Sequence, residues 1–134
     1  MVGLVVVSHS LALAGAAVAL ASEMLHGTPV PIAVAAGTAD GMTGTDATRI
    51  AEAVTSVATG DGVLVVMDLG SAILSTELAL ELVGDLDDEV RLSAGPFVEG
   101  LVAAAVTAST GASLDRVAAE ADAALAPKAG HLAR

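Results

Sequence analysis

Four short apolar runs, each separated from the next by a stretch of helical character, constrain the fold of this chain most strongly. The runs lie at Val2–Val7, Val30–Ala35, Val63–Met67 and Val90–Ser93, and the first three contain no charged residue. Continuous apolar strands that alternate with helices are typical of a parallel sheet that is buried on both faces. Because crossovers between parallel strands are right-handed, we predict an α/β fold with an open, doubly wound, mainly parallel sheet. The expected strand order is the flavodoxin-like 2-1-3-4, with helices on both faces.

The stretches between and after these runs are predicted to be helices from the spacing of their apolar residues. The predicted helices span Leu11–Leu25, Asp46–Ala58, Ser71–Val83, Phe97–Ser109 and Leu114–Leu125. Two polar residues, Ser10 and Asp46, are expected to cap the first two helices at their N-termini. The apolar positions of the third helix are Ile73, Leu74, Leu78 and Leu82. We predict one domain over residues 1–126, long enough for a real core, and a loose C-terminal tail over residues 127–134.

Charge and composition exclude several classes of protein. The net charge is −11 with only five lysines and arginines, so no basic patch is available for nucleic acid. The apolar stretch Leu11–Ala21 is much shorter than the ~20 residues that a membrane-spanning helix needs. The first basic residue is Arg49, whereas a signal peptide requires positive charge near its start. The absence of cysteine excludes disulfides and thiolate sites and fits a cytoplasmic protein.

The strongest candidate for chemistry is His9, which follows the first predicted strand in the segment Ser8-His9-Ser10. Sites in folds of this kind lie at the carboxyl ends of the strands, where the strand order reverses between strands one and three. Asp68 directly follows the third strand, so we expect it beside His9. A carboxylate that accepts a hydrogen bond from one ring nitrogen leaves the other nitrogen free as a nucleophile. The alternative is a histidine that only caps the strand end by bonding to backbone.

Hydroxyl groups and a glycine follow the same two strands, at Ser8, Ser10, Gly70 and Ser71. Both segments lead into helices, whose first N–H groups and positive dipole ends favour an anion such as a phosphoryl group. Ordinary capping by Ser10 and Ser71 is the alternative, and the two roles are compatible. The glycine- and threonine-rich loop Gly37–Asp46 is expected to be either a rim or lid of the same site or a flexible connector.

The usual motifs for nucleotide and metal binding are missing. The sequence has no Gly-x-x-x-x-Gly-Lys-Ser/Thr loop and no Gly-x-Gly-x-x-Gly after the first strand. His26 and His131 have no metal-ligand spacing with His9, so we expect neither a metal nor a bound cofactor on this chain. Enzymes that catalyse phosphoryl transfer need Arg, Lys or Mg²⁺ to offset charge. A protein that only carries a phosphoryl group, and borrows the rest from its partner, does not.

Four segments, in this order along the chain, resemble those of a known family. They are Ser8-His9-Ser10, Gly44-Thr45-Asp46, Met67-Asp68-Leu69-Gly70-Ser71-Ala72 and Gly95-Pro96-Phe97-Val98-Glu99-Gly100. Over residues 1 to about 110 the chain is similar to the phosphotransfer subunits (DhaM) of phosphoenolpyruvate-dependent dihydroxyacetone kinases. The domain of these subunits belongs with the mannose-type enzyme IIA domains of the sugar phosphotransferase system.

The resemblance implies a phosphotransferase subunit that carries a phosphoryl group on a histidine. His9 would accept the group from phospho-HPr on Nε2 and pass it to ADP, which the partner subunit DhaL holds as a standing cofactor. The regenerated ATP then phosphorylates dihydroxyacetone on the DhaK subunit. Asp68 matches the carboxylate that orients the histidine, and Ser71 matches the loop that faces the phosphohistidine. The family's behaviour also implies a homodimer, and a chain of one domain is expected to rely on separate carriers.

Two other functions stay open at this point: a mannose-type enzyme IIA domain that feeds a sugar transporter, and a non-catalytic ligand-binding or regulatory module. The segment Met67–Ala72 favours the dihydroxyacetone branch, because Gly-Gly-Ser-Pro is expected after the aspartate in the transporter branch. The partner distinguishes the first two functions, since one uses a nucleotide-loaded subunit and the other a membrane permease. We further expect the Asp68 carboxylate on a surface loop, so that Asp68→Ala slows transfer without unfolding the sheet.

Overall fold

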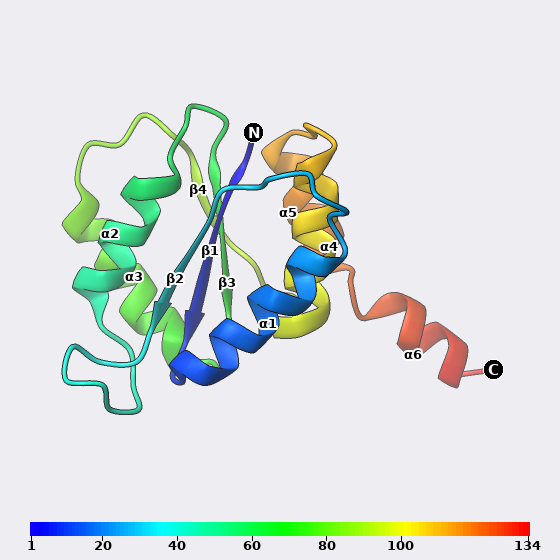
Figure 1. Ribbon diagram of the computed structural model, residues 1–134, viewed down its shortest axis with the longest axis horizontal. Helices are drawn as coiled ribbons and strands as arrows, with labels where there is room; N and C mark the ends of the chain where they lie inside the picture. The colour runs from blue at the N-terminus through cyan, green and yellow to red at the C-terminus, as the bar shows by residue number, and fades with distance from the viewer.

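A computed structural model describes residues 1–134 and shows a four-stranded sheet flanked by helices (Figure 1). The strands are β1 (Gly3–Ser8), β2 (Ile32–Ala36), β3 (Val63–Met67) and β4 (Val90–Leu92). All of them pair in parallel, in the order β2-β1-β3-β4. The predicted α/β fold and the strand order 2-1-3-4 are therefore confirmed.

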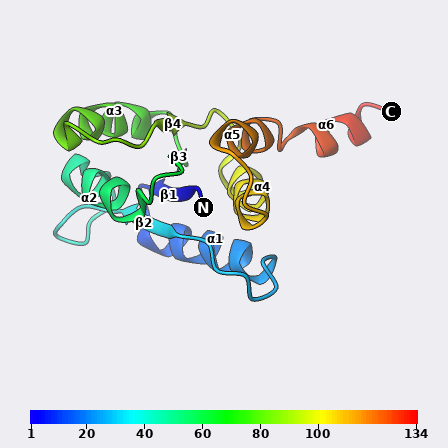
Figure 2. The same ribbon diagram turned by 90° about the horizontal axis from the view of Figure 1, so that it is seen from above.

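The helices cover both faces of the sheet, as expected for a doubly wound fold (Figure 2). They are α1 (Leu11–Glu23), α2 (Ala47–Val57), α3 (Ser71–Val83), α4 (Phe97–Ser109), α5 (Leu114–Asp122) and α6 (Ala126–Leu132). Helices α2 and α3 pack on one face, and α1, α4 and α5 pack on the other.

The central strand β1 supplies both hydrophobic cores through the alternation of its side chains. Leu4 and Val6 contribute to the core under α1, α4 and α5, and Val5 and Val7 contribute to the core under α2 and α3. All four are fully buried. A strand with two buried faces must be apolar at every position, which is why the predicted strands read as continuous apolar runs.

The first two predicted helices begin where their predicted N-cap residues lie. The hydroxyl of Ser10 accepts a hydrogen bond from the N–H of Leu13, and the carboxylate of Asp46 accepts one from the N–H of Thr48. Both predicted N-caps are thus confirmed. The helix ends and strand starts fit less well, because α1 ends at Glu23 rather than Leu25, and β2 begins at Ile32 rather than Val30.

The apolar residues that indicated helix α3 mostly point outward. Ile73, Leu74, Leu78 and Leu82 are 41%, 73%, 50% and 56% exposed, respectively. The helix buries smaller side chains instead, namely Ala72, Thr76 and Ala79. These small residues allow α3 to approach the sheet closely. The buried Thr76 hydroxyl has a hydrogen-bond partner, because it donates to the carbonyl of Ala72.

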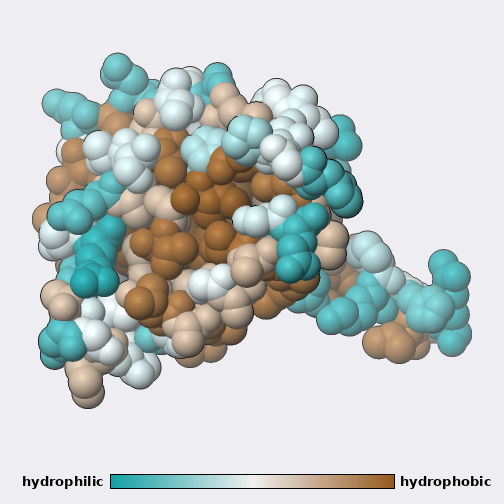
Figure 3. All heavy atoms as spheres, in the orientation of Figure 1, coloured by the Kyte–Doolittle hydropathy of each residue, from teal (hydrophilic) through white to brown (hydrophobic).

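The edge strand β2 is only partly covered. Figure 3 shows hydrophobic residues at the surface where β2 runs between α1 and α2, and Val34 of this strand is 38% exposed. The C-terminal residues 127–134, predicted to be a loose tail, largely form α6, which projects away from the body of the molecule (Figure 1). None of its residues is buried, so local i→i−4 hydrogen bonds hold this helix rather than core packing. No helix of this chain combines the length and apolarity that a membrane crossing requires.

The segment Gly95–Gly100 runs into the start of α4 and lies against α5. A Cβ atom on Gly95 would lie 2.1 Å from the carbonyl oxygen of Ala121, whereas one on Gly100 would lie 3.4 Å from the same atom. Two glycines of the fourth family-like segment thus face the α4–α5 contact, and the first of them is required there on steric grounds.

Candidate functional site

The structure brings His9 and Asp68 together at the carboxyl end of the sheet. Val7 of β1 pairs in register with Met67 of β3, so the residues that follow these strands leave the sheet side by side. The ring nitrogen Nδ1 of His9 lies 2.9 Å from Oδ1 of Asp68. The predicted juxtaposition at the switch point is therefore present.

The Asp68 carboxylate is held by four hydrogen-bond donors from two strand ends. Its Oδ2 accepts from the backbone N–H of His9 and the hydroxyl of Ser8, both at 2.9 Å, and its Oδ1 accepts from the His9 ring and the N–H of Leu69. Burial works to raise the pKa of Asp68, but the donors from His9, Ser8 and Leu69 together lower it below its ordinary value. The side chain is only 6% exposed, so the expectation of a surface carboxylate was wrong.

The hydrogen bonds fix the tautomer of His9. An ionised carboxylate can only accept, so Nδ1 carries the proton and donates it to Asp68. Nε2 then has a free lone pair, and the hydroxyl of Ser71 lies 2.8 Å from it as the donor. The His9 side chain is 20% exposed. The ring therefore presents a nucleophilic nitrogen to the outside while its other nitrogen is anchored in the protein.

The four predicted anion-binding residues take different places in the structure. Ser8 is fully buried, and its hydroxyl donates to Asp68 and accepts from the N–H of Ser10. It supports Asp68 and exposes no surface of its own to the site. Ser10 caps α1, whereas Gly70 and Ser71 form the start of α3 next to the His9 ring.

The loop between β2 and α2 borders a cavity of about 350 Å³ beside His9. Residues 37–39 and 41–43 of the loop form one side of the cavity, and His9, Ser10 and Leu11 form the other. The N–H of Gly44 donates to the carbonyl of His9, and the N–H of Gly37 donates to the carbonyl of Ser8. These bonds tie the loop to the backbone of the site, so it forms the rim that was one of the two expectations for it.

Arg49 is the residue of the site that the sequence did not indicate. It lies in the first turn of α2 and lines the same cavity as His9. The only available signal was its position three residues after the cap Asp46, on a helix that starts at the same edge of the sheet. His26 and His131 take no part in the site, and no three His, Asp or Glu side chains converge as a metal site would require.

The lowered pKa of Asp68 predicts a specific acid dependence of stability. An aspartate has a pKa of about 3.9 when unfolded. Because the folded pKa is lower, ionised Asp68 stabilises the fold above the unfolded pKa, and this contribution is lost as the pH falls through the folded pKa. Wild-type protein should therefore lose more unfolding free energy than Asp68→Asn between about pH 5 and pH 2. Urea denaturation across this range measures the difference, and parallel curves for the two proteins would contradict it.

Comparison with known proteins gives a consistent set of relatives. The model of the EIIA-man family, described as "PTS system fructose IIA component", matches residues 3–118. The chain is 50% identical over 120 residues to "PEP-dependent dihydroxyacetone kinase, phosphoryl donor subunit DhaM" of Escherichia coli K12, covering 87% of this chain and 25% of that protein. It is 48% identical over 135 residues to the subunit of the same name from Pantoea ananatis, covering 98% of this chain and 28% of that protein. The chain thus spans about a quarter of the length of these relatives.

A shorter relative and a solved structure match over nearly their whole length. "PEP-dependent dihydroxyacetone kinase 2, phosphoryl donor subunit DhaM" of Listeria innocua is 35% identical over 121 residues, which cover 90% of this chain and 96% of that protein. The crystal structure of "unknown function protein EF1359" superposes with a TM-score of 0.79 at 31% identity, over 90% of this chain and 92% of that one.

Proposed function

We propose, from the premise that this chain belongs to the EIIA-man family, that it is the phosphoryl donor subunit of a PEP-dependent dihydroxyacetone kinase and carries the phosphoryl group on His9. One observation supports the role of His9 above all. Its Nδ1 is bonded to the buried Asp68 at 2.9 Å, which leaves Nε2 as the nucleophile at the edge of a cavity.

In the proposed uptake step, phospho-HPr supplies the phosphoryl group. The lone pair of Nε2 forms a bond to phosphorus, and the bond between phosphorus and the donor's nitrogen breaks with its electron pair returning to the donor. The His9 ring becomes positively charged, because Nδ1 keeps its proton. The ionised Asp68 carboxylate stabilises this charge, as it would in a histidine–carboxylate pair of any nucleophilic site.

In the proposed delivery step, ADP held by a DhaL subunit accepts the group and ATP forms there, for use with the DhaK subunit. This chain then needs no cofactor of its own. The proposed role places the chain in the cytoplasm, which its lack of cysteine fits. We also propose that the chain forms a homodimer, and sedimentation equilibrium of the purified protein would contradict this if it returned the monomer mass.

Intact-mass spectrometry after incubation with phosphoenolpyruvate, enzyme I and HPr tests the proposal. One added phosphoryl group, labile in acid, is expected. Addition of the DhaL subunit with ADP should then remove the group and produce ATP, whereas a permease of the mannose type should not. If the carriers are active and no mass is added, the chain is not a phosphocarrier.

Replacement of Ser71 by alanine is expected to slow phosphoryl uptake roughly 10- to 100-fold, because a hydrogen bond to a charged group contributes about 1.5–3 kcal/mol. The Ser71 hydroxyl lies 2.8 Å from Nε2, and after uptake it would donate to an oxygen of the bound phosphoryl group. Single-turnover uptake from phospho-HPr measures the effect. Ser22→Ala, an exposed position on α1, is the control, and an equal rate in the two variants would rule out this role.

A further inference from the structure

The cavity beside His9 contains one cationic side chain, and that side chain has no partner within the protein. Three of the five basic residues form ion pairs with acidic side chains: Arg91, Arg116 and Lys128. Arg134 is the last residue of the chain, on the projecting segment. Arg49 forms no ion pair or side-chain hydrogen bond, although it is the only basic residue that lines this cavity.

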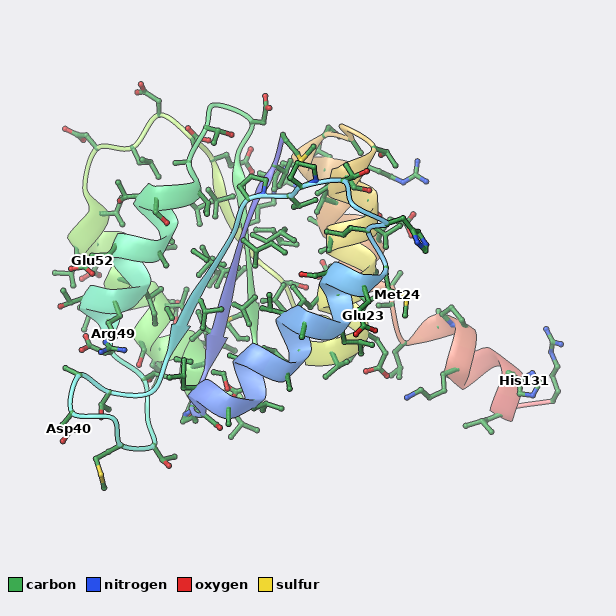
Figure 4. All side chains as sticks on the ribbon, in the orientation of Figure 1. Glu23, Met24, Asp40, Arg49, Glu52 and His131 are labelled. Carbon is green, nitrogen blue, oxygen red and sulfur yellow. The ribbon has the colours of Figure 1, made fainter.

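No group around Arg49 within the protein stabilises its positive charge. The positive end of the helix dipole lies in the first turn of α2, so a cation there is electrostatically unfavourable. Figure 4 shows Arg49 beside the loop that carries Asp40, with Glu52 one turn further along α2. The Asp40 carboxylate is used within its own loop by Thr38 and Met42, and Glu52 forms no ion pair with Arg49. The guanidinium therefore remains available to an anion that enters the cavity.

We propose that Arg49 binds the terminal phosphate of the acceptor nucleoside diphosphate during transfer from His9. This inference rests on the proposed function. Transfer brings an anionic phosphate against an anionic phosphoryl group, next to Asp68 and on a chain of net charge −11. An arginine offsets such charge well, because its planar guanidinium donates two parallel hydrogen bonds to phosphate oxygens.

The lining of the cavity indicates which part of the nucleotide enters. The chain has a single aromatic residue, Phe97, and it does not line the cavity, so no ring is present to stack on a base. A cavity of about 350 Å³ with hydroxyls from Ser10, Thr38 and Thr43 suits a hydrated diphosphate end. The base and sugar would then stay on the partner subunit.

The step balances without a further reactant. An oxygen of the terminal phosphate forms a bond to phosphorus, and the bond between phosphorus and Nε2 breaks. Its electron pair returns to Nε2, the His9 ring loses its positive charge, and Nδ1 keeps its proton toward Asp68. Arg49 holds the attacking phosphate and is not consumed.

The test separates uptake from delivery in four proteins: wild type, Arg49→Gln, Arg49→Lys and Arg116→Gln. Arg116→Gln removes the same charge from α5, where Arg116 is paired with Glu120 and does not line the cavity. Each protein is phosphorylated by phospho-HPr and then mixed with the ADP-loaded acceptor subunit in a single turnover. ATP formation and the loss of phosphoryl mass are followed at several concentrations of the acceptor.

For Arg49→Gln, we expect uptake within about twofold of wild type and delivery slowed roughly 10- to 100-fold. Arg49→Lys should fall between them, because lysine keeps the charge without the paired donors. Arg116→Gln should behave as wild type. Circular dichroism and thermal melting check that the variants stay folded.

Three results would overturn the assignment of Arg49 while leaving the proposed function in place. Delivery at the wild-type rate by Arg49→Gln would show that Arg49 does not touch the acceptor. Equal slowing of uptake and delivery would show instead that Arg49 contacts the carried phosphoryl group. Equal slowing of delivery by Arg116→Gln would show that the effect of Arg49→Gln comes only from the change in net charge. The failure of wild type to take up any phosphoryl group would overturn the proposed function along with this inference.

Discussion

His9→Ala should take up no phosphoryl group from phospho-HPr while it remains folded. The substitution removes Nε2, the one atom that the proposed chemistry requires, so the expected effect is complete loss rather than slowing. Neither His26 nor His131 lines the cavity, and neither can substitute for His9 there.

The contacts of Asp68 explain why the fold should survive. Without the His9 ring, the carboxylate still accepts from the N–H groups of His9 and Leu69 and from the hydroxyl of Ser8. No buried charge is left without partners, so the loss of unfolding free energy should not exceed that of one hydrogen bond to a charged group, about 1.5–3 kcal/mol. Intact mass and urea denaturation on the same sample test both parts. Undiminished labelling of His9→Ala would place the phosphoryl group on another residue.

Gly95→Ala should lower the unfolding free energy by about 3 kcal/mol, at the upper end of the usual cost of overpacking. The new Cβ would lie 2.1 Å from the carbonyl oxygen of Ala121 and 2.8 Å from its carbonyl carbon. These are backbone atoms of α5 and cannot move aside as the end of a side chain can. Helices α4 and α5 would have to move apart, and this would loosen the packing of the core that they share under the sheet.

Two other glycines are matched controls for this prediction. At Gly100, within α4, a Cβ would lie 3.4 Å from the Ala121 oxygen, an ordinary contact, so Gly100→Ala should not destabilise the protein. At Gly15, within α1, a Cβ would meet nothing within 4 Å, and Gly15→Ala should stabilise by about 0.5–1 kcal/mol through helix propensity. Thermal melting should show a fall of about 10 °C for Gly95→Ala alone. Equal melting temperatures for Gly95→Ala and Gly100→Ala would contradict the steric argument.

The features that the sequence predicted well are those set by neighbouring residues. The run Val63–Met67 is β3 to the residue, and Ser71–Val83 is α3 to the residue. The caps Ser10 and Asp46 act over two or three positions, so they too are encoded locally. The meeting of His9 with Asp68 was also predictable, because parallel strands in the order 2-1-3-4 place the ends of β1 and β3 side by side.

The features that the sequence did not predict depend on which face of an element is buried and on what lies opposite. The leucines of α3 point outward because small residues on its other face pack closely against the sheet. The Asp68 side chain is covered at the end of β1, where the fully buried Ser8 donates to it, and Gly95 is required because Ala121, far along the chain, approaches it.

By itself, then, the sequence determined the elements, their order in the sheet and the histidine–carboxylate pair, because short-range periodicity and strand pairing are enough to fix them. Only the tertiary structure decided that Arg49 lines the cavity of His9. The loop between β2 and α2 bonds back to the carbonyls of Ser8 and His9 and thereby brings the start of α2 to the site. These contacts join Gly37 to Ser8 and Gly44 to His9, far apart along the chain, and backbone hydrogen bonds leave no pattern in the side chains.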